Sequence, residues 1–322
     1  MRPSTPMTAP TIGFDIGGTN LRAGVVDADG ALRESRSVPT PGDAEAVEHA
    51  VVDLVAALRT DHPDVAAVGL ALAGFLNVER TVVRFAPHLP FRGTPLQAQL
   101  QARLDVPVVL EHDANAAAWG EYRFGAGADA HTWVFFAVGT GIGATLMVDG
   151  EIYRGAYGTA PEFGHLSVVP GGRACSCGKS GCLERYASGT ALVPTARELA
   201  ARGIGAGSAL AQTLATSPDA VTSHAVVAAA RAGDALGRAV LEDFAQWLGQ
   251  GFSVVADVLD PELIVLGGGL AADADLYVDR ARDALRRQVV GAGFRPVPRI
   301  ATAELGPDAG MIGVADLARR PV

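Results

Sequence analysis

The sequence predicts an α/β protein with two domains, and three observations support this fold class. The 322 residues are about twice the length of an average domain. Short apolar runs alternate with longer segments of helical periodicity, as expected for buried strands and the helices that cover them. A strand–glycine–strand pattern occurs at 13–32 and again at 135–153, which indicates two related halves.

The domain boundary is expected near Asp113. We predict a small α/β domain at 1–113 and a large one at 114–302, with a C-terminal helix at about 303–322 returning to the first domain.

Composition excludes several classes of protein. Hydrophobic residues make up 49% of the chain and charged residues 19%, which is typical of a folded, globular protein. The net charge of −9 argues against general affinity for nucleic acid or anionic membranes, because both require basic surfaces. No apolar run approaches the ~18 residues of a membrane span, and the first ten residues lack the apolar centre of a secretory signal. We therefore expect a cytoplasmic protein with a loose N-terminal tail.

The elements of the first half follow in order. Each copy of the repeated pattern has a strand, a Gly/Thr turn, a second strand and an Asp-Gly pair that favours a type I′ hairpin, at Asp29-Gly30 and Asp149-Gly150. Asp43 can cap a helix whose apolar residues recur at three- and four-residue steps up to Leu58. Buried strands are expected at 65–72 and 106–111, and a helix at about 114–122.

The second half is mostly helical. A long amphipathic helix is predicted over 236–259, and Pro261 prevents it from continuing further. The string LIVLGGGL then gives a short buried strand that runs into Gly267, Gly268 and Gly269. Helices at about 275–290 and 311–319 complete the alternation.

All the cysteines of the chain lie in one string, CSCGKSGCLE, as Cys175, Cys177 and Cys182, and His165 precedes Cys175 by ten residues. Three thiolates and one imidazole make a tetrahedral zinc set, and Gly178 and Gly181 allow the tight turns that such close ligands need. Because four protein ligands leave no position for water, the predicted zinc is structural. The alternative is a chance cluster of reduced cysteines.

Two glycine turns are candidate phosphate sites, because backbone N–H groups without side chains can approach a ligand closely. The alternative is a pair of ordinary hairpins with glycine at positive φ. Asp15, at the end of the preceding strand, could hold Mg²⁺ directly or through water. The turns contain Gly17, Gly18, Thr19 and Asn20 in the first copy, and Gly139, Thr140 and Gly141 in the second.

Asp113 is the candidate catalytic residue. It follows a strand and opens a helix, where active-site side chains often project in α/β folds. As a general base it could take a proton from a hydroxyl that attacks a phosphoryl group. The alternative role, which can coexist, is that of an N-cap.

Glu162, His165 and Glu184 form a third candidate cluster. One ring nitrogen of His165 could bind zinc while the other hydrogen-bonds a vicinal hydroxyl of a ligand. Alternatively, the two glutamates only support the zinc site or lie at the surface.

These motifs together resemble the ROK family of repressors, unknown reading frames and sugar kinases. The resemblance runs from about Ile12 to the C-terminus, and the CxCGxxGCxE string is its most specific part. Within the family, the chain is most similar to bacterial ATP-dependent glucokinases, notably at 84–89 and 119–127. The matching strings are DIGGTN, ALAGF, EHDANAAAWGE, VGTGIG, GHLSV, CSCGKSGCLERYASG and IVLGGGL.

The resemblance implies an actin-like (ribonuclease H-like) two-domain sugar kinase fold that closes around ATP and D-glucose, with Asp113 as the base. It implies that Glu162, His165 and Glu184 bind sugar hydroxyls, and that Gly74 lines the same site. The glycine turns would hold the phosphates of ATP, Gly267–Gly269 would approach the adenosine, and Mg²⁺ and structural Zn²⁺ would be the cofactors. A homo-oligomer is also implied.

Two departures from the family pattern concern the sugar. His112 stands where the family's glucokinases usually have an asparagine that contacts a sugar hydroxyl, and Pro161 stands where the family often has glycine. A kinase for mannose, fructose or an N-acetylated amino sugar therefore remains an alternative, as does a non-catalytic sugar sensor. An actin-like assembly ATPase is disfavoured by the predicted zinc cluster.

Overall fold

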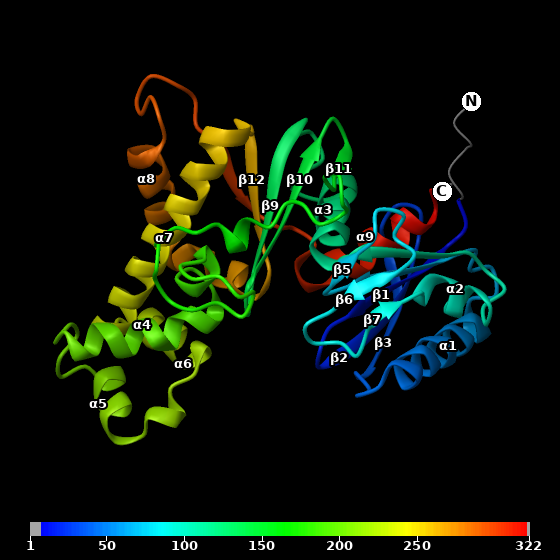
Figure 1. Cartoon of the computed structure of the whole chain (residues 1–322), viewed down its shortest axis with the longest axis horizontal. Coiled ribbons are helices and arrows are strands. Elements are labelled where there is room, and N and C mark those ends of the chain that lie inside the picture. Colours follow the sequence, from blue (N-terminus) through cyan, green and yellow to red (C-terminus); the bar gives the residue numbers. More distant parts are fainter. Residues whose placement is uncertain (1–7, 321–322) are drawn as a thin grey trace. The chain divides into compact units, whose positions relative to one another are not determined.

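The computed structural model describes residues 8–320, which form two compact units (Figure 1). Unit 1 comprises the chain up to His131, Thr145–Pro161 and the chain from Ala303 onward. Unit 2 comprises Thr132–Ala144 and Glu162–Thr302. The expected N-terminal tail lies largely outside the described residues.

Unit 1 contains a mixed sheet with the strand order β3-β2-β1-β4-β8. The strands β1, β2 and β3 form an antiparallel meander, whereas β4 and β8 run parallel to β1. The strand bounds are β1 Thr11–Ile16, β2 Asn20–Val26, β3 Leu32–Pro39, β4 Val68–Leu72 and β8 Val108–His112. A small antiparallel sheet follows β4 and consists of β5 Phe75–Leu76, β6 Val83–Phe85 and β7 Arg92–Thr94.

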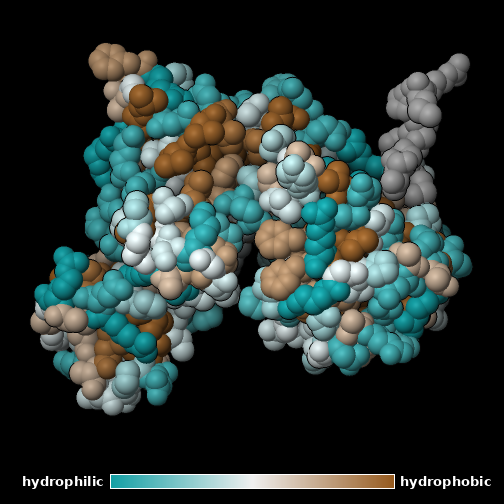
Figure 2. All heavy atoms as spheres, in the orientation of Figure 1, coloured by the Kyte–Doolittle hydropathy of each residue, from teal (hydrophilic) through white to brown (hydrophobic). Residues whose placement is uncertain are grey.

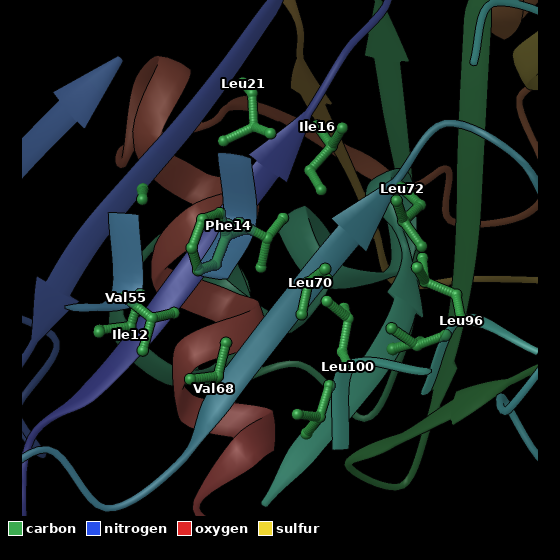
Figure 3. Packing of buried hydrophobic residues seen from close by; sticks show 14 of the residues in the cluster. Ile12, Phe14, Ile16, Leu21, Val55, Val68, Leu70, Leu72, Leu96 and Leu100 are labelled. Carbon is green, nitrogen blue, oxygen red and sulfur yellow. The ribbon is translucent and has the colours of Figure 1, made fainter. Parts of the chain in front are cut away.

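One face of this sheet carries the main core of unit 1 (Figure 3). Side chains alternate along each strand, so Ile12 and Phe14 point to the same face, where the helices α1 and α2 supply further apolar groups. α1 spans Ala44–Asp61, and its cap is the predicted Asp43, which accepts a hydrogen bond from the Ala46 N–H at 2.8 Å. α2 spans Leu96–Gln101.

The opposite face of the sheet is covered by α9 Ala309–Ala318. The paired glycines Gly13 and Gly69 allow this close packing, because a Cβ on either would lie within 2.2 Å of a backbone oxygen of α9. The helix α3 Asp113–Phe124 packs on α9 through Gly120 and Gly313 in the same way. Whereas the sequence placed a boundary after Asp113, this packing groups α3 with unit 1.

The sheet of unit 2 has the strand order β11-β10-β9-β12-β13. Its strands are β9 Thr132–Val138, β10 Ile142–Val148, β11 Glu151–Tyr153, β12 Leu263–Gly267 and β13 Arg299–Thr302, with the end of β10 and all of β11 grouped in unit 1. The helices are α4 Gly189–Ala201, α5 Ala209–Thr216, α6 Ser223–Arg231, α7 Ala235–Leu259 and α8 Val278–Gln288. The predicted helix at 275–290 begins later, because Gly269–Leu276 form 3₁₀ turns interrupted by non-helical Asp273.

The two Asp-Gly turns differ. At the second, Asp149 and Gly150 have φ of 49° and 77° between the paired residues Val148 and Glu151, which confirms the predicted type I′ hairpin. At the first, only Gly30 has positive φ, at 86°, and Asp27 and Ala31 close a longer turn next to a register shift between β2 and β3. The type I′ prediction for Asp29-Gly30 is therefore wrong, because the Asp29 carboxylate accepts from the Ala31 N–H and stabilises a different turn.

Two surface properties complete the description. Among the helices of residues 8–320, none combines the length and the apolar character needed to cross a bilayer. The loop after α8 exposes apolar groups, seen as brown and tan spheres above unit 2 in Figure 2. Phe294 is 96% and Val290 65% exposed in this loop.

Candidate active site and metal centre

The carboxyl ends of β1, β4 and β8 bring two acidic residues to one face of the unit 1 sheet. Asp15 on β1 pairs with Ala71 on β4, and Ala71 pairs with Glu111 on β8. Because side chains alternate, Asp15 and Glu111 point away from Phe14 and Leu110, toward the face that α3 and α9 cover. Asp113 follows Glu111 by two residues at the start of α3.

Asp113 is the first residue of α3, and its side chain is 43% exposed. Its Oδ1 accepts a hydrogen bond from the Ala114 N–H at 2.7 Å and lies 3.2 Å from His112 Nε2. The N-cap residue of α3 is His112, whose side chain makes no capping hydrogen bond. Asp113 is therefore not the N-cap that the sequence suggested as its alternative role. The carboxylate of Asp113 is instead a partly exposed group at the positive end of a helix dipole.

Asp15 and Asp113 interact electrostatically. Burial, and then the negative charge of Asp113, raise the pKa of Asp15 to about 6, while Arg22 acts in the opposite direction. The start of α9 leaves room between them, since a Cβ on Gly310 would be 4.0 Å from Asp15 Cγ and 3.9 Å from the Asp113 carbonyl oxygen. A divalent cation beside Asp15 would relieve the cost of its buried charge, and hard cations prefer such oxygen ligands.

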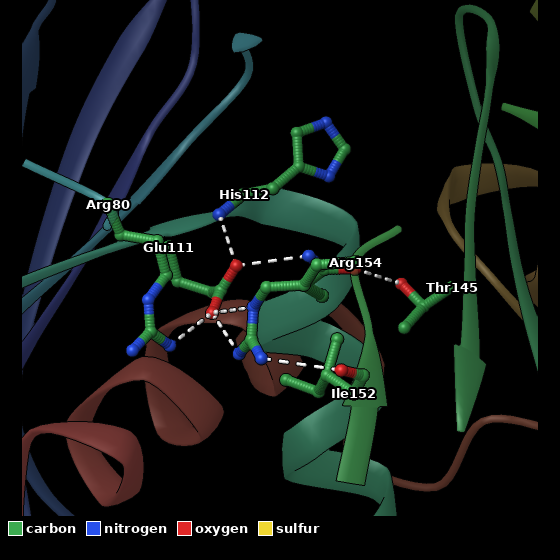
Figure 4. A network of polar contacts seen from close by, with 7 residues as sticks. Arg80, Glu111, His112, Thr145, Ile152 and Arg154 are labelled. Carbon is green, nitrogen blue, oxygen red and sulfur yellow. Dashed lines mark hydrogen bonds and ion pairs between the residues drawn. The ribbon is translucent and has the colours of Figure 1, made fainter. Parts of the chain in front are cut away.

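Glu111 is the centre of a polar network behind Asp113 (Figure 4). Its side chain is 1% exposed and receives Arg154 Nη2 at 2.5 Å and Arg80 Nη1 at 3.2 Å on Oε2. Its Oε1 accepts from the Asn115 side chain and from the His112 N–H, each at 3.0 Å. Sequence reasoning missed this network, because Arg80 and Arg154 are far from Glu111 in the chain and match no local motif.

The first glycine turn, Gly17–Asn20, lies within unit 1. The Gly17 N–H donates to the Asn20 carbonyl at 3.1 Å, and a Cβ on Gly18 would approach His88 Cβ to 2.9 Å. Neither glycine has positive φ, so the alternative of an ordinary hairpin with left-handed glycine does not apply here. Gly74, after β4, likewise has close neighbours, with Ala86 Cβ only 2.7 Å from where its own Cβ would be.

The second glycine turn, Gly139–Gly141, lies within unit 2 beside the predicted adenosine segment. The Gly139 and Thr140 carbonyls accept from Gly189 N–H and Thr190 Oγ1 at the start of α4, at 2.8 Å and 2.9 Å. A Cβ on Gly139 would be 3.8 Å from Gly269 N, so the segments 139–141 and 267–269 are neighbours. Gly141 and Gly139 also lack positive φ.

The predicted zinc ligands come together in unit 2. The ligand atoms of His165, Cys175, Cys177 and Cys182 all lie within 4.8 Å of one another. Cys175 Sγ lies 3.7 Å from His165 Nδ1, and Cys177 Sγ lies 3.7 Å from Cys182 Sγ. These separations match the edge of about 3.8 Å expected for a tetrahedron with Zn–S bonds of about 2.3 Å. The chemistry of the four donors and their spacing fit a closed structural zinc site.

The two glycines of the zinc loop are required by the backbone. Gly178 and Gly181 have φ of 89° and 76°, and a Cβ on Gly181 would be 1.7 Å from the Val169 carbonyl oxygen. Burial raises the pKa of the Cys175 thiol to about 12, whereas a bound zinc ion would favour the thiolate. Lys179, another residue missed at the sequence level, donates from Nζ to the His165 carbonyl at 2.6 Å.

His165 presents its two ring nitrogens to different neighbours. Nδ1 faces the thiols and lies 3.6 Å from Glu184 Oε1, while Nε2 lies 4.0 Å from Glu162 Oε2. The 3₁₀ turn Phe163–His165 is held by stacking of Phe163 on Phe136 and by Gly164, whose Cβ would be 2.3 Å from the Ile142 carbonyl oxygen. The two predicted sugar-binding glutamates of unit 2 are therefore both neighbours of His165, each beside a different ring nitrogen.

The second glycine turn contacts this cluster. A Cβ on Gly141 would come within 2.7 Å of Glu184 Oε2, so glycine at this position makes room for a carboxylate. The predicted site residues fall into both units: Asp15, Gly17–Asn20, Gly74, His112 and Asp113 belong to unit 1, and Gly139–Gly141, Glu162, His165, Glu184, Gly267–Gly269 and the three cysteines belong to unit 2.

The comparisons with known proteins confirm the predicted actin-like α/β fold of the sugar kinase type. The chain belongs to the ROK family, whose model matches residues 11–321. It is 41% identical to a glucokinase of Streptomyces coelicolor over 97% of this chain and 98% of that protein. The crystal structure of a ROK family glucokinase from Streptomyces griseus in complex with glucose and AMPPNP superposes with a TM-score of 0.84, at 41% identity, over 96% of this chain and 99% of that one. The crystal structure of a ROK hexokinase from Thermus thermophilus superposes with a TM-score of 0.80 at 32% identity, over 96% of this chain and 97% of that one.

Proposed function

We propose that the protein is an ATP-dependent glucokinase, which transfers the γ-phosphoryl group of ATP to the 6-hydroxyl of D-glucose. One observation carries the proposal: the chain is similar, over 96% of its length, to a glucokinase whose crystal structure holds glucose and AMPPNP. The Cys₃His cluster with its two neighbouring glutamates supports the proposal, because a sugar needs several hydroxyl partners in a fixed arrangement.

In this mechanism Asp113 is the general base. Its partly exposed carboxylate accepts the proton of the sugar 6-hydroxyl while that oxygen attacks the γ-phosphorus and ADP leaves. The carboxylate lies at the N-terminal end of α3, where the helix dipole is positive.

The sugar is held by hydroxyl contacts. Glu162 and Glu184 accept hydrogen bonds from sugar hydroxyls, and His165 uses Nε2 for the sugar, because Nδ1 faces the thiols. Gly74 and His112 contribute from unit 1. His165, Cys175, Cys177 and Cys182 would hold a structural zinc ion, and this coordination would keep the imidazole in place.

ATP is held mainly by backbone groups. The N–H groups of Gly17–Asn20 and Gly139–Gly141 contact its phosphates, and Gly267–Gly269 approach the adenosine. Asp15 would hold Mg²⁺ directly or through water, and the ion supplies charge screening for the phosphates. The raised pKa of Asp15, about 6, supports this role, since its buried charge has an incomplete balance of cations.

A second candidate is a kinase for another hexose. His112 supports it, because an imidazole at this position presents a different shape and hydrogen-bonding pattern from an amide. The similarity to the Thermus thermophilus hexokinase is compatible with either sugar preference.

ADP release from ATP and Mg²⁺ with a panel of hexoses tests both candidates. Glucose, mannose, fructose, N-acetylglucosamine and N-acetylmannosamine are compared by kcat/KM, and glucose-6-phosphate dehydrogenase reports whether the 6-hydroxyl is the acceptor. We expect glucose to give the highest kcat/KM. A higher value for another hexose supports the second candidate, and ligand binding without ADP release supports a sugar sensor.

We also propose that the enzyme acts in the cytoplasm, where ATP and a reduced thiol cluster coexist. The homo-oligomer expected from the family resemblance is tested by light scattering of the purified protein.

A further inference from the structure

We propose that Glu111 is a positioning residue for the phosphoryl transfer: its buried carboxylate, held by Arg80 and Arg154, fixes the turn that presents Asp113. The inference rests on the proposed function, because it assigns Glu111 a role that acts through the base. Glu111 itself is 1% exposed and contacts neither sugar nor nucleotide in the proposed mechanism.

The geometry leaves no free side on the carboxylate. Oε1 accepts from the His112 N–H and Asn115 Nδ2, each at 3.0 Å. Oε2 accepts from Arg154 Nη2 at 2.5 Å, from Arg154 Nε at 3.1 Å and from Arg80 Nη1 at 3.2 Å. An ionised carboxylate can accept from all of these donors because it carries no hydrogen of its own, whereas a glutamine would turn an NH₂ group against the donors on one side.

The charge state follows from the same contacts. Burial acts to raise the pKa of Glu111, but the charge and hydrogen bonds of Arg154, the Asn115 amide and the charge of Arg80 outweigh it, so its pKa is lowered. Glu111 is therefore an anion at neutral pH. Its ion pairs are largely shielded from water, and this shielding makes them stronger than ion pairs at the surface.

The network holds the chain on both sides of Asp113. Its donors include the backbone of His112, which precedes Asp113, and the side chain of Asn115, which follows it. Asn115 is fixed in turn by Thr145 Oγ1, which donates to its Oδ1 at 2.9 Å in a fully buried contact (Figure 4). The direction in which Asp113 projects from the start of α3 is thus set by Glu111.

The two arginines come from segments that pack on each other. A Cβ on Gly158 would be 3.2 Å from the backbone of Asn77 and Val78, so these two segments are in close contact. The segment of Gly158 is linked to Arg154 by a hydrogen bond from the Ala160 N–H to the Arg154 carbonyl. Arg80 has a φ of 58°, a costly conformation for a residue with a side chain, and lies in a turn closed by Asn77 Oδ1. The unfavourable φ of Arg80 accompanies its contact with Glu111, and this supports a functional role for the pair.

The test is Glu111→Gln, with Glu121→Gln as the matched control. Glu121 is a fully buried acid in the same helix as Asp113, and it accepts N–H groups of Ala126, Glu304 and Leu305. Both variants remove a buried carboxylate from unit 1. We expect Glu111→Gln to lower kcat roughly 10²-fold, since misplacing a reacting group by about 1 Å costs that much, while KM for the sugar changes less than about 3-fold. Glu121→Gln is expected to lower the melting temperature and to keep kcat within about 3-fold.

A double-mutant cycle separates positioning from general loss of structure. In the Asp113→Asn background, Glu111→Gln should change the residual turnover, measured with radiolabelled ATP, by less than about 3-fold, because the group it positions is gone. An additive loss of about 10²-fold in that background overturns the inference. So does a kcat of Glu111→Gln within about 3-fold of wild type.

If Glu111→Gln does not fold, Arg154→Lys replaces it in the same cycle. Lysine keeps the charge but cannot make the two-pronged contact with Oε2, so we expect about a 10-fold loss of kcat that likewise vanishes in the Asp113→Asn background. Unchanged kcat in Arg154→Lys overturns the inference. The proposed function is tested separately by wild-type turnover: wild-type turnover without a loss in the variants overturns only the positioning role, whereas no wild-type turnover on any hexose overturns both.

Discussion

The carboxylate of Asp15 is buried where it feels the negative charge of Asp113, and the two effects together raise the pKa of Asp15 to about 6. Asp15 lies near the carboxyl end of β1, and Asp113 directly follows β8 as the first residue of α3, so both belong to unit 1. The ionised carboxylate of Asp15 therefore has an electrostatic cost, which a cation beside it would reduce.

The first prediction concerns this cost and its dependence on pH. Because the folded pKa lies above the ordinary value of 3.8, the ionised Asp15 destabilises the fold fully above about pH 6, and the effect disappears as the pH falls toward 4. Asp15→Asn should therefore stabilise the nucleotide-free protein by roughly 2–3 kcal/mol at pH 8, and by much less at pH 4.5. Melting temperatures at the two pH values check this, with Asp64→Asn at an exposed position as the control. Equal stabilisation at both pH values would contradict it.

The second prediction concerns the base. Asp113→Asn keeps the shape of the side chain but cannot accept the proton, so kcat should fall by about 10²–10⁴-fold. Sugar affinity, measured by calorimetry, should stay within about 3-fold, because most sugar contacts are proposed for unit 2. Near-wild-type ADP release from this variant would remove Asp113 from the mechanism.

The third prediction concerns zinc. Cys177→Ser should lose the metal and weaken sugar binding, because structural zinc contributes on the order of 10–16 kcal/mol to local folding and His165 shares the site. Metal content by mass spectrometry and glucose affinity by calorimetry are measured on the same samples. Ser176→Ala, an exposed neighbour in the same loop, is the control and should keep both. Zinc loss with unchanged glucose affinity would show that the metal does not hold the sugar site.

The fourth prediction concerns Gly141. A methyl group here would come within 2.7 Å of Glu184 Oε2 and push this carboxylate from its place beside His165. Gly141→Ala should therefore raise KM for the sugar by roughly 10-fold, as expected for the loss of a hydrogen bond to a charged group. Gly42→Ala is the control, because a Cβ at Gly42 meets nothing within 4 Å. An increase in KM for ATP with an unchanged KM for the sugar would contradict this prediction and leave Gly141 with its proposed phosphate role alone.

Local patterns predicted much of the fold. The Asp43 cap, the long helix ending before Pro261 and the strand at LIVLG are all found, because each depends on periodicity or on a residue within one turn. The zinc cluster was predictable for the same reason, since three of its four ligands lie within eight residues.

The features that were missed depend on contacts between distant residues. Glu111 pairs with Arg154, 43 residues away, and only the packing of β8, β11 and the Asn77–Thr81 turn brings them together. The requirement for glycine at position 141 could not be predicted either, because it arises from the nearby carboxylate of Glu184, which is distant in sequence. The first Asp-Gly turn was mispredicted because the hydrogen bond from Ala31 to Asp29 competes with the type I′ geometry.

The hydrogen bond from Lys179 to the His165 carbonyl has a practical consequence, because Lys179 is the only lysine in the sequence. All the other Lys/Arg positions of the sequence are arginines, whose guanidinium groups do not react with common acylating reagents under mild conditions. Amine coupling to a biosensor chip or a fluorophore would thus fall, apart from the α-amino group, on the zinc loop itself. Immobilisation through an engineered cysteine-free tag avoids tethering the protein by the residue that supports its sugar-binding histidine.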